Sequence, residues 1–458
     1  MVFSPELAET RFGCGLSPVV TPPRSAGDML DGLADADDMA ARFPIGTFDS
    51  YRDYLFEARK LQRAFNKDRQ DKDKRAAFQQ AKDRARQTDM QFSVNTLLRC
   101  TYSTTPFRER LVAFWSDHFT AYGKNNVMGT ATTPYIEDAI RPRITGRFGD
   151  MLVAVTTHPL MLHYLDQDRS VGPDSKAALQ KGGGLGLNEN LAREVMELHT
   201  LGVGGPYAQD DVRQLAELFT GMGFSPAKGF VFRAAQAEPG AETLLGKSYG
   251  GNPARVEPII DALHDLAVHP ATARHIARKL AVHFVADTPP DELVDHLAAR
   301  YADTGGDLMQ VYAALLDHPA AWQEPRVNIK PPVDFIASAW RALAVDPDHA
   351  AQLPFNDLRR TLVQPLKLMG QPWQRPVGPD GWSEHDEAWL TPQGVATRLR
   401  WAVSAPRTLR PDLPEPTAFV DQVLGPYATE PVRFAARAAE SKSDAIGLIL
   451  ASPAFQRR

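Results

Sequence analysis

The sequence predicts a mainly α-helical protein, a large multi-helix single unit with a small β-hairpin near residues 229–250. Apolar residues recur at intervals of three and four through most of the chain, as they do on one face of a helix. Hydrophobic residues make up 43% and charged residues 23% of the 458 residues, which is enough for a sizeable core. Only the segment 229–250 lacks helical periodicity, and it contains a Pro-Gly turn.

Composition narrows the classes of function. A net charge of −5 argues against a general nucleic-acid binder, because such proteins usually carry a basic excess. Two cysteines, Cys14 and Cys100, are too few for a disulfide framework or a cysteine-only zinc site. No apolar run reaches the roughly 18 residues of a membrane span, so we expect no membrane insertion. The opening MVFSPELAETRFG lacks the basic and apolar regions of a signal peptide, which predicts a cytoplasmic protein.

We expect one domain over residues 1–458, because the chain has no fixed-period repeat and no long low-complexity linker. Residues 59–89 carry eleven Lys or Arg against five Asp or Glu, but the two signs are interleaved. That pattern favours a solvated helical arm over a nucleic-acid surface. The predicted parts are an N-terminal arm 1–50, a charged helical segment 51–90, a signature core 91–224, a hairpin 225–252 and a C-terminal helical part 253–458.

Helix boundaries follow from periodicity and from punctuating residues. Phe107, Leu111, Phe114 and His118 share one helix face, and Pro106 suits the first turn of that helix. The stretch 11–24 mixes Gly and Pro and is expected to be irregular. Further helices are predicted around 135–141, from 151, from 159, and at 188–200, 209–220, 253–266, 270–285, 291–303, 306–317, 332–344, 355–368, 391–403 and 442–451.

A family resemblance runs through nearly the whole chain. The string NENLAREVMELHTLGVGGPYAQDDVRQLAELFTGMGF (188–224) resembles the signature of the bacterial family called domain of unknown function 1800. RFGCGLSP, FWSDHF (114–119), HPLMLHYLD (158–166), KPPVDFIASAWRAL, PDGWSEHDEAWL and the terminal LILASPAFQRR resemble its other motifs. The resemblance implies a large, mostly helical unit without an established activity. It also implies an envelope or exported setting and a sulfatase-like partner protein.

This chain departs from the family pattern at three places. Asp117 stands where the pattern favours Asn. Ala208 stands where a Thr would cap the second helix of the signature, which costs roughly 1 kcal/mol. The PDGW loop also differs in spacing from the usual form.

The predicted helix 188–200 carries the residue pattern with the most chemistry. Glu194 and Glu197 are i,i+3 neighbours on one flank, beside a buried face that includes Leu191. Two carboxylates at that spacing can share a divalent metal, or can raise one pKa for general acid catalysis. A structural polar network explains the same pattern, and Glu189 and Arg193 form an i,i+4 pair typical of a surface salt bridge.

Two histidines are candidates as metal ligands or proton shuttles. His118 continues the apolar stripe of its helix, and a satisfied core histidine is the structural alternative. His199 lies in the last turn of its helix, where the helix dipole favours a cation. If the two helices pack on each other, His118 is expected to approach Glu194 and Glu197. The candidate ligands of a divalent metal are therefore His118, Glu194, Glu197 and His199.

The leading functional hypothesis is a metal- or carboxylate-dependent hydrolase or transferase acting on a polar substrate, a glycan or a sulfate or phosphate ester. The alternative is a non-catalytic binding or assembly protein whose polar cluster is structural. The tryptophans of the loop 370–392 either line a carbohydrate groove or anchor the loop by packing; they are Trp373, Trp382 and Trp389. The candidate catalytic residues are Glu194, Glu197, Arg193, Asn190 and Asp117.

Overall fold

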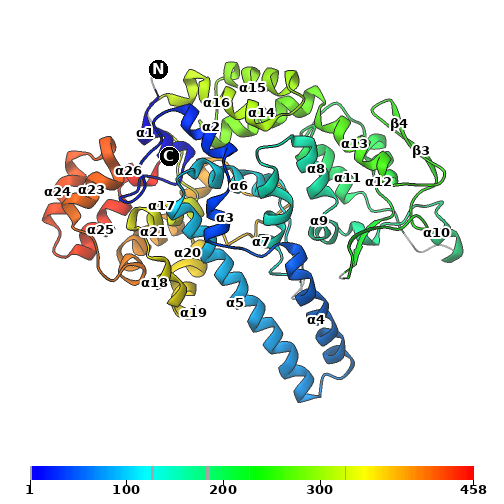
Figure 1. The fold of residues 1–458 in the computed structure, drawn as a ribbon, viewed down its shortest axis with the longest axis horizontal. Helices are drawn as coiled ribbons and strands as arrows, with labels where there is room; N and C mark the ends of the chain where they lie inside the picture. The colour runs from blue at the N-terminus through cyan, green and yellow to red at the C-terminus, as the bar shows by residue number, and fades with distance from the viewer. Residues whose placement is uncertain (1–2, 125–127, 182–185, 226, 325) are drawn as a thin grey trace.

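The computed structural model is mostly helical and contains two small antiparallel sheets (Figure 1), which confirms the predicted fold class. It describes residues 3–124, 128–181, 186–225, 227–324 and 326–458. Within these ranges no helix has both the length and the apolar character needed to cross a membrane.

The N-terminal part is a set of short helices followed by a long helical hairpin. The segment predicted as irregular, 11–24, begins two residues later, because Arg11 and Phe12 end a π-helical turn, Ala8–Phe12. The helices of this part are α1 (Pro5–Leu7), α2 (Ala26–Ala34), α3 (Asp38–Arg42), α4 (Phe48–Lys67) and α5 (Lys72–Tyr102).

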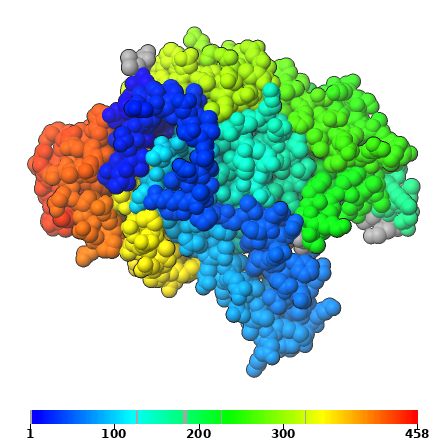
Figure 2. All heavy atoms as spheres, viewed as in Figure 1, coloured from blue at the N-terminus to red at the C-terminus, as the bar shows by residue number. Residues whose placement is uncertain are grey.

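Helices α4 and α5 pack on each other and form an arm that projects from the body (Figures 1 and 2). Thr47 and Asp71 cap their N-termini, and the Phe65 and Phe78 rings stack near the tip with centroids 5.8 Å apart. Most other side chains near the tip are exposed, as expected for interleaved charges. The charged segment is therefore two stacked helices.

The middle of the chain is helical, and prolines mark several helix starts as predicted. Pro106, Pro159 and Pro270 are each the first residue of a helix, where the missing N–H has no intrahelical partner to lose. The helices are α6 (Pro106–His118), α7 (Thr132–Tyr135), α8 (Phe148–Thr156), α9 (Pro159–Tyr164), α10 (Lys176–Lys181), α11 (Asn190–Glu194), α12 (Gln209–Leu218), α13 (Glu257–Ala267), α14 (Pro270–Phe284), α15 (Asp291–Asp303) and α16 (Leu308–Asp317).

Two hairpins stand where the sequence predicts one. β1 (Met222–Ser225) pairs with β2 (Gly229–Phe232), and β3 (Gly240–Leu244) pairs with β4 (Lys247–Gly251), all antiparallel. The second hairpin turns at Leu245 and Gly246, whose φ angles of 49° and 79° suit a two-residue hairpin loop. The first strand escapes prediction because it follows α12 directly and is too short to show an alternating pattern.

The C-terminal part packs around its own hydrophobic cluster, centred on Trp340, while a second cluster fills the rest of the body around Trp115. The helices at 416–438 were not among those expected from the sequence. The helices are α17 (Pro332–Leu343), α18 (Pro347–Gln352), α19 (Phe355–Leu358), α20 (Gln364–Leu368), α21 (Pro392–Ser404), α22 (Pro406–Leu409), α23 (Pro416–Leu424), α24 (Glu430–Ala438), α25 (Lys442–Ala451) and α26 (Pro453–Gln456).

Arg341 on α17 joins segments that are far apart in the sequence. Its side chain is fully buried and donates to Glu9 Oε2 at 2.9 Å and to the Gly15 carbonyl at 2.7 Å. Its Nη1 also donates to three carbonyls at the end of α5, those of Cys100, Thr101 and Ser103. One guanidinium thus fixes the N-terminal segment against both α5 and α17.

Arg341→Met should strongly destabilise the protein, because it leaves the buried Glu9 carboxylate and several carbonyls without donors. We expect the free energy of unfolding to fall by about 3–5 kcal/mol in chemical denaturation. Arg274→Met is the matched control, since the Arg274–Asp295 pair is exposed and should change stability by less than about 1 kcal/mol. Equal losses in the two variants would contradict a special role for Arg341.

Candidate functional site

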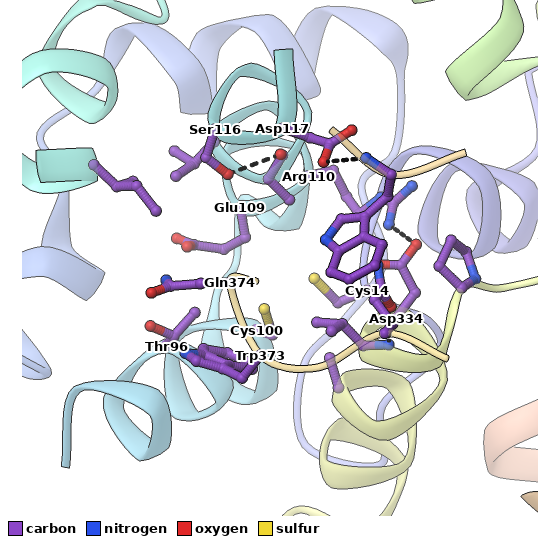
Figure 3. Close-up of a pocket in the computed structure, with 18 of the residues that line it drawn as sticks. Cys14, Thr96, Cys100, Glu109, Arg110, Ser116, Asp117, Asp334, Trp373 and Gln374 are labelled. Atoms are coloured by element: carbon purple, nitrogen blue, oxygen red, sulfur yellow. Dashed lines mark hydrogen bonds and ion pairs between the residues drawn. The ribbon is translucent and has the colours of Figure 1, made fainter. Parts of the chain in front are cut away.

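A cavity of about 200 Å³ lies between α5, α6, α17 and the loop that joins α20 to α21 (Figure 3). The loop contributes the three tryptophans singled out from the sequence, Trp373, Trp382 and Trp389, to the cavity wall. The indole N–H groups of Trp373 and Trp389 are buried and have no hydrogen-bond partner among the described residues. The titratable side chains in the wall are Cys14, Cys100, Glu109, Asp117, Glu137, His283, Lys330, Asp334 and Glu384, beside the guanidinium groups of Arg99, Arg110, Arg141 and Arg458.

A buried ionic network occupies one side of the cavity. Asp334 forms ion pairs with both Arg110 and Arg458. Arg110 Nη2 lies 3.0 Å from His283 Nε2, and His283 Nδ1 lies 2.7 Å from Glu384 Oε1. Because the guanidinium can only donate, His283 carries its proton on Nδ1 and donates it to Glu384.

This network keeps two carboxylates ionised. Burial opposes ionisation of Glu384, but His283 and Arg458 outweigh it and lower the pKa to about 2. Burial likewise opposes ionisation of Asp334, and the two arginines lower its pKa to about 2. At neutral pH both groups are therefore anions whose charge is largely balanced by neighbours.

Asp117 lines the same cavity in the opposite protonation state. It follows Ser116 near the end of α6, and its Oδ1 accepts a hydrogen bond of 2.9 Å from the Trp382 backbone N–H. Burial raises the pKa of Asp117 to about 7, and the negative charges of Glu384 and Asp380 act in the same direction. Lys279 and the Trp382 amide lower it by less. The wall thus holds an acid that titrates near neutral pH beside an ionised carboxylate.

Glu194 lies within electrostatic reach of the same loop. Burial raises its pKa to about 7, with further contributions from Glu197 and Asp380. The negative charge of Asp380 raises the pKa of both Asp117 and Glu194. The exposed end of the loop therefore couples the cavity to the signature helix electrostatically. Glu194 does not line the cavity itself.

Arg193 and Asn190 lie at the surface. Arg193 forms ion pairs with Glu189 at 3.1 Å and with Glu197 at 3.2 Å, which confirms the contact predicted between Glu189 and Arg193. Its guanidinium also donates to Gln209, so few of its N–H donors remain for binding a substrate anion. Asn190 is exposed, and its backbone N–H donates to the Asn188 side chain at the start of α11.

The signature helix differs from the predicted single α-helix over 188–200. It is α-helical from Asn190 to Glu194 and then forms a π-helical turn, Val195–His199. Thr200 Oγ1 donates to the Val195 carbonyl at 2.6 Å and secures the end of the turn. A π turn changes the angle between successive side chains, so a wheel of 100° per residue misplaces those beyond Glu194.

Two histidines cap this helix end, one buried and one half-buried. His118 Nε2 lies 3.2 Å from the His199 carbonyl, and His275 Nε2 lies 3.0 Å from the Leu198 carbonyl. Both carbonyls are at the end of the helix, where intrahelical donors run out. Since a carbonyl only accepts, His118 carries its proton on Nε2. Burial lowers the pKa of His118 and of His199, with Lys279 adding to the effect, so both rings are neutral.

The structure brings His118 and His199 together, with ring centroids 6.0 Å apart, and the buried Nδ1 atom of each has no hydrogen-bond partner among the described residues. Among contacts of the described residues, His118 reaches the helix end and neither Glu194 nor Glu197. Within the described part of the chain, no group of three or more His, Cys, Asp or Glu is arranged to hold a metal ion. Two free ring nitrogens are fewer than the three protein ligands of a typical catalytic zinc site.

Most of the cavity residues were not predicted as functional, although several lie in the motifs that resemble the family pattern. The missed functional residues are Arg110, His283, Asp334, Glu384 and Arg458. Asp334 lies in KPPVDFIASAWRAL, Glu384 in PDGWSEHDEAWL and Arg458 in LILASPAFQRR. The signal that was available is that all three strings are parts of one family pattern.

A family model described as "Protein of unknown function (DUF1800)" matches residues 16–457, nearly the whole chain. Comparisons with curated proteins and with solved structures give no significant match.

The raised pKa of Asp117 makes a pH-dependent contribution to stability. Its folded pKa of about 7 lies above the value of about 3.9 expected in the unfolded chain. Between these values the folded state binds the extra proton, so the contribution weakens as pH rises from about 4 to about 7. Asp117→Asn should therefore be more stable than the wild type at pH 8 by about 4 kcal/mol, and close to it at pH 4. A stability difference that does not change with pH in urea denaturation would contradict this.

Two substitutions at His118 separate helix capping from metal binding. His118→Gln keeps a donor for the His199 carbonyl, whereas His118→Leu leaves that buried carbonyl unpaired. We expect the free energy of unfolding of the Leu variant to be about 1–3 kcal/mol lower than that of the Gln variant. If both variants are equally destabilised and both lose a metal that elemental analysis finds in the wild type, His118 is a ligand instead.

Proposed function

The chain belongs to the DUF1800 family, and we propose that it is a carboxylate-dependent hydrolase or transferase that acts on a glycan. The observation that carries the proposal is the pair of carboxyl groups in one cavity wall, Asp117 with a pKa of about 7 and Glu384 with a pKa of about 2. Two carboxyl groups whose environments separate their pKa values are the usual basis for acid and base roles in one site.

Asp117 is suited to be the general acid. Near neutral pH a large fraction of it is protonated, and its Oδ1 is already fixed by the Trp382 amide. A proton from Asp117 would go to the oxygen that leaves when a glycosidic bond breaks. The acid would then be an anion until it recovers a proton from the attacking water or alcohol.

Glu384 supplies the second carboxyl group. His283 holds it by a 2.7 Å hydrogen bond, and Arg458 lies 3.6 Å from its Oε2. A fixed anion in a partly enclosed cavity stabilises the positive charge that develops on a sugar ring during bond cleavage. Glu384 is also able to orient the attacking water. The hydrogen bonds from His283 to Glu384 and between Arg110 and His283 hold the Glu384 carboxylate in position as well as stabilising its charge.

The wall of the cavity favours a glycan over a sulfate or phosphate ester. An ester anion needs cations whose charge is not already neutralised, but Arg110 and Arg458 are paired with Asp334 and Glu384. Tryptophan faces and unpartnered indole N–H groups suit a ligand that is apolar on its ring faces and carries hydroxyl groups at its edge. Trp373 and Trp389 offer both features.

The carboxylate form of the hypothesis has more support than the metal form. The four proposed ligands include two carboxylates, Glu194 and Glu197, that contact Arg193 or lie near Asp380 rather than meeting the two histidines. A divalent metal at His118 and His199 would need a further protein ligand. We therefore assign Glu194 a supporting electrostatic role at the edge of the site.

One observation favours the alternative of a non-catalytic binding or assembly protein. The ionised groups of the cavity, Asp334 and Glu384, each have cationic or histidine partners, and such a network also serves to fasten the loop and the C-terminus. In that case the tryptophan-lined cavity would bind a glycan without cleaving it. A sulfatase-like partner and an envelope setting, which the resemblance implies, fit either form.

The proposal is tested by screening the purified full-length chain against polysaccharides and aryl glycosides, with aryl sulfates and aryl phosphates in parallel. We expect release of reducing ends from at least one glycan, with activity that falls as pH rises above about 7 because Asp117 loses its proton. Asp117→Asn should lower the rate by about 100-fold or more, since an amide has no proton to give.

Asp303→Asn is the matched control, because Asp303 is exposed at the end of α15 and should leave the rate unchanged. Turnover of an aryl sulfate or phosphate alone would contradict the glycan assignment. Glycan binding, seen as quenched tryptophan fluorescence, without any turnover would favour the binding protein.

A further inference from the structure

The only two cysteines of the chain lie together in the cavity wall. Cys14 is in the N-terminal segment and Cys100 is near the end of α5, and both line the cavity. Figure 3 shows their sulfur atoms near each other among the side chains that line the cavity. Both thiols are free. The acid–base chemistry proposed above uses neither of them.

The Arg341 side chain fixes the backbone next to both cysteines. Arg341 donates from Nε to the Gly15 carbonyl at 2.7 Å and from Nη1 to the Cys100 carbonyl at 3.0 Å. One buried side chain thus binds the residue after Cys14 and the backbone of Cys100 itself. Gly15 has a φ of 97°, a conformation that glycine adopts without strain. The backbone can therefore turn directly after Cys14.

The thiol pair is accessible to a small reagent through the cavity. Cys14 is 5% exposed and Cys100 is partly exposed. The cavity that they line is also lined by the tryptophans of the loop between α20 and α21. The neighbouring Cys14 thiol, together with burial, raises the pKa of Cys100, so only a small fraction of this thiol is the reactive thiolate at neutral pH. Reaction should accelerate as pH rises.

We propose that Cys14 and Cys100 are an oxidation site that forms an intramolecular disulfide when a small-molecule disulfide enters the cavity. One protein thiolate attacks the reagent and releases one thiol, giving a mixed disulfide. The second protein thiolate then attacks the bound sulfur, so the Cys14–Cys100 bond forms and a second thiol leaves. The protein loses two electrons and two protons, and the reagent gains them. The product links the N-terminal segment covalently to α5 at the cavity wall.

The test uses the full-length protein and oxidised glutathione at pH 7 and at pH 9. After reaction the protein is denatured and treated with iodoacetamide, and its mass is measured. We expect a product that is two hydrogen atoms lighter, carries no alkyl group and no glutathione, and forms faster at pH 9. A non-reducing peptide map should join the peptides of Cys14 and Cys100.

Cys14→Ser and Cys100→Ser are the matched controls, and each should stop at a single mixed disulfide or a single alkylated thiol. If either variant fails to fold, the wild-type peptide map still decides. Recovery of two alkylated cysteines after oxidation would overturn the proposal. So would two glutathione adducts on one chain, or disulfide-linked dimers in place of the internal bond.

Discussion

Buried guanidinium groups determine how the distant segments of this chain meet. A guanidinium has five N–H donors and stays charged, so inside a protein it must gather a carboxylate and several carbonyls. Arg341 gathers Glu9, the Gly15 carbonyl and the end of α5. Arg141 pairs with Glu109 and Asp37, and Arg99 pairs with Glu137 while donating to the Phe43 carbonyl. The segments that these contacts hold together, with the loop before α21, form the wall of the cavity.

The same contacts set the electrostatics of the cavity. Arg110 and Arg458 balance Asp334, and Arg458 with His283 balances Glu384, so these carboxylates stay ionised. Asp117 is close to the negative charge of Glu384 and has no ion-pair partner among the described residues, so burial raises its pKa to about 7 and a large fraction of it is protonated at neutral pH. An acid and an anion can coexist in one wall because the cations are distributed unequally. That asymmetry is the basis of the proposed function.

Periodicity and proline positions were sufficient to predict most helices, because burial of one helix face repeats every three or four residues. They did not predict the π turn after Glu194 or its capping by His118 and His275, which come from elsewhere in the chain. For the same reason the site was predicted only in part. Asp117 and the three tryptophans were identified, but the pairing of Glu384 with His283 joins α14 to a loop about a hundred residues away. No local pattern reports such a contact.

The central claim is that Asp117 titrates near neutral pH while Glu384 stays ionised. Infrared difference spectroscopy of the wild-type protein during a pH titration tests it directly, because protonated and ionised carboxyl groups absorb at different frequencies. In protein labelled with ¹³C-aspartate, a shifted protonated carboxyl band should disappear with a midpoint near pH 7 and should be absent from Asp117→Asn. The unshifted band of Glu194, which titrates in the same range, should remain in both proteins. If the Asp117→Asn difference spectrum matches that of the wild type, the claim is wrong and the cavity has no acid at that position.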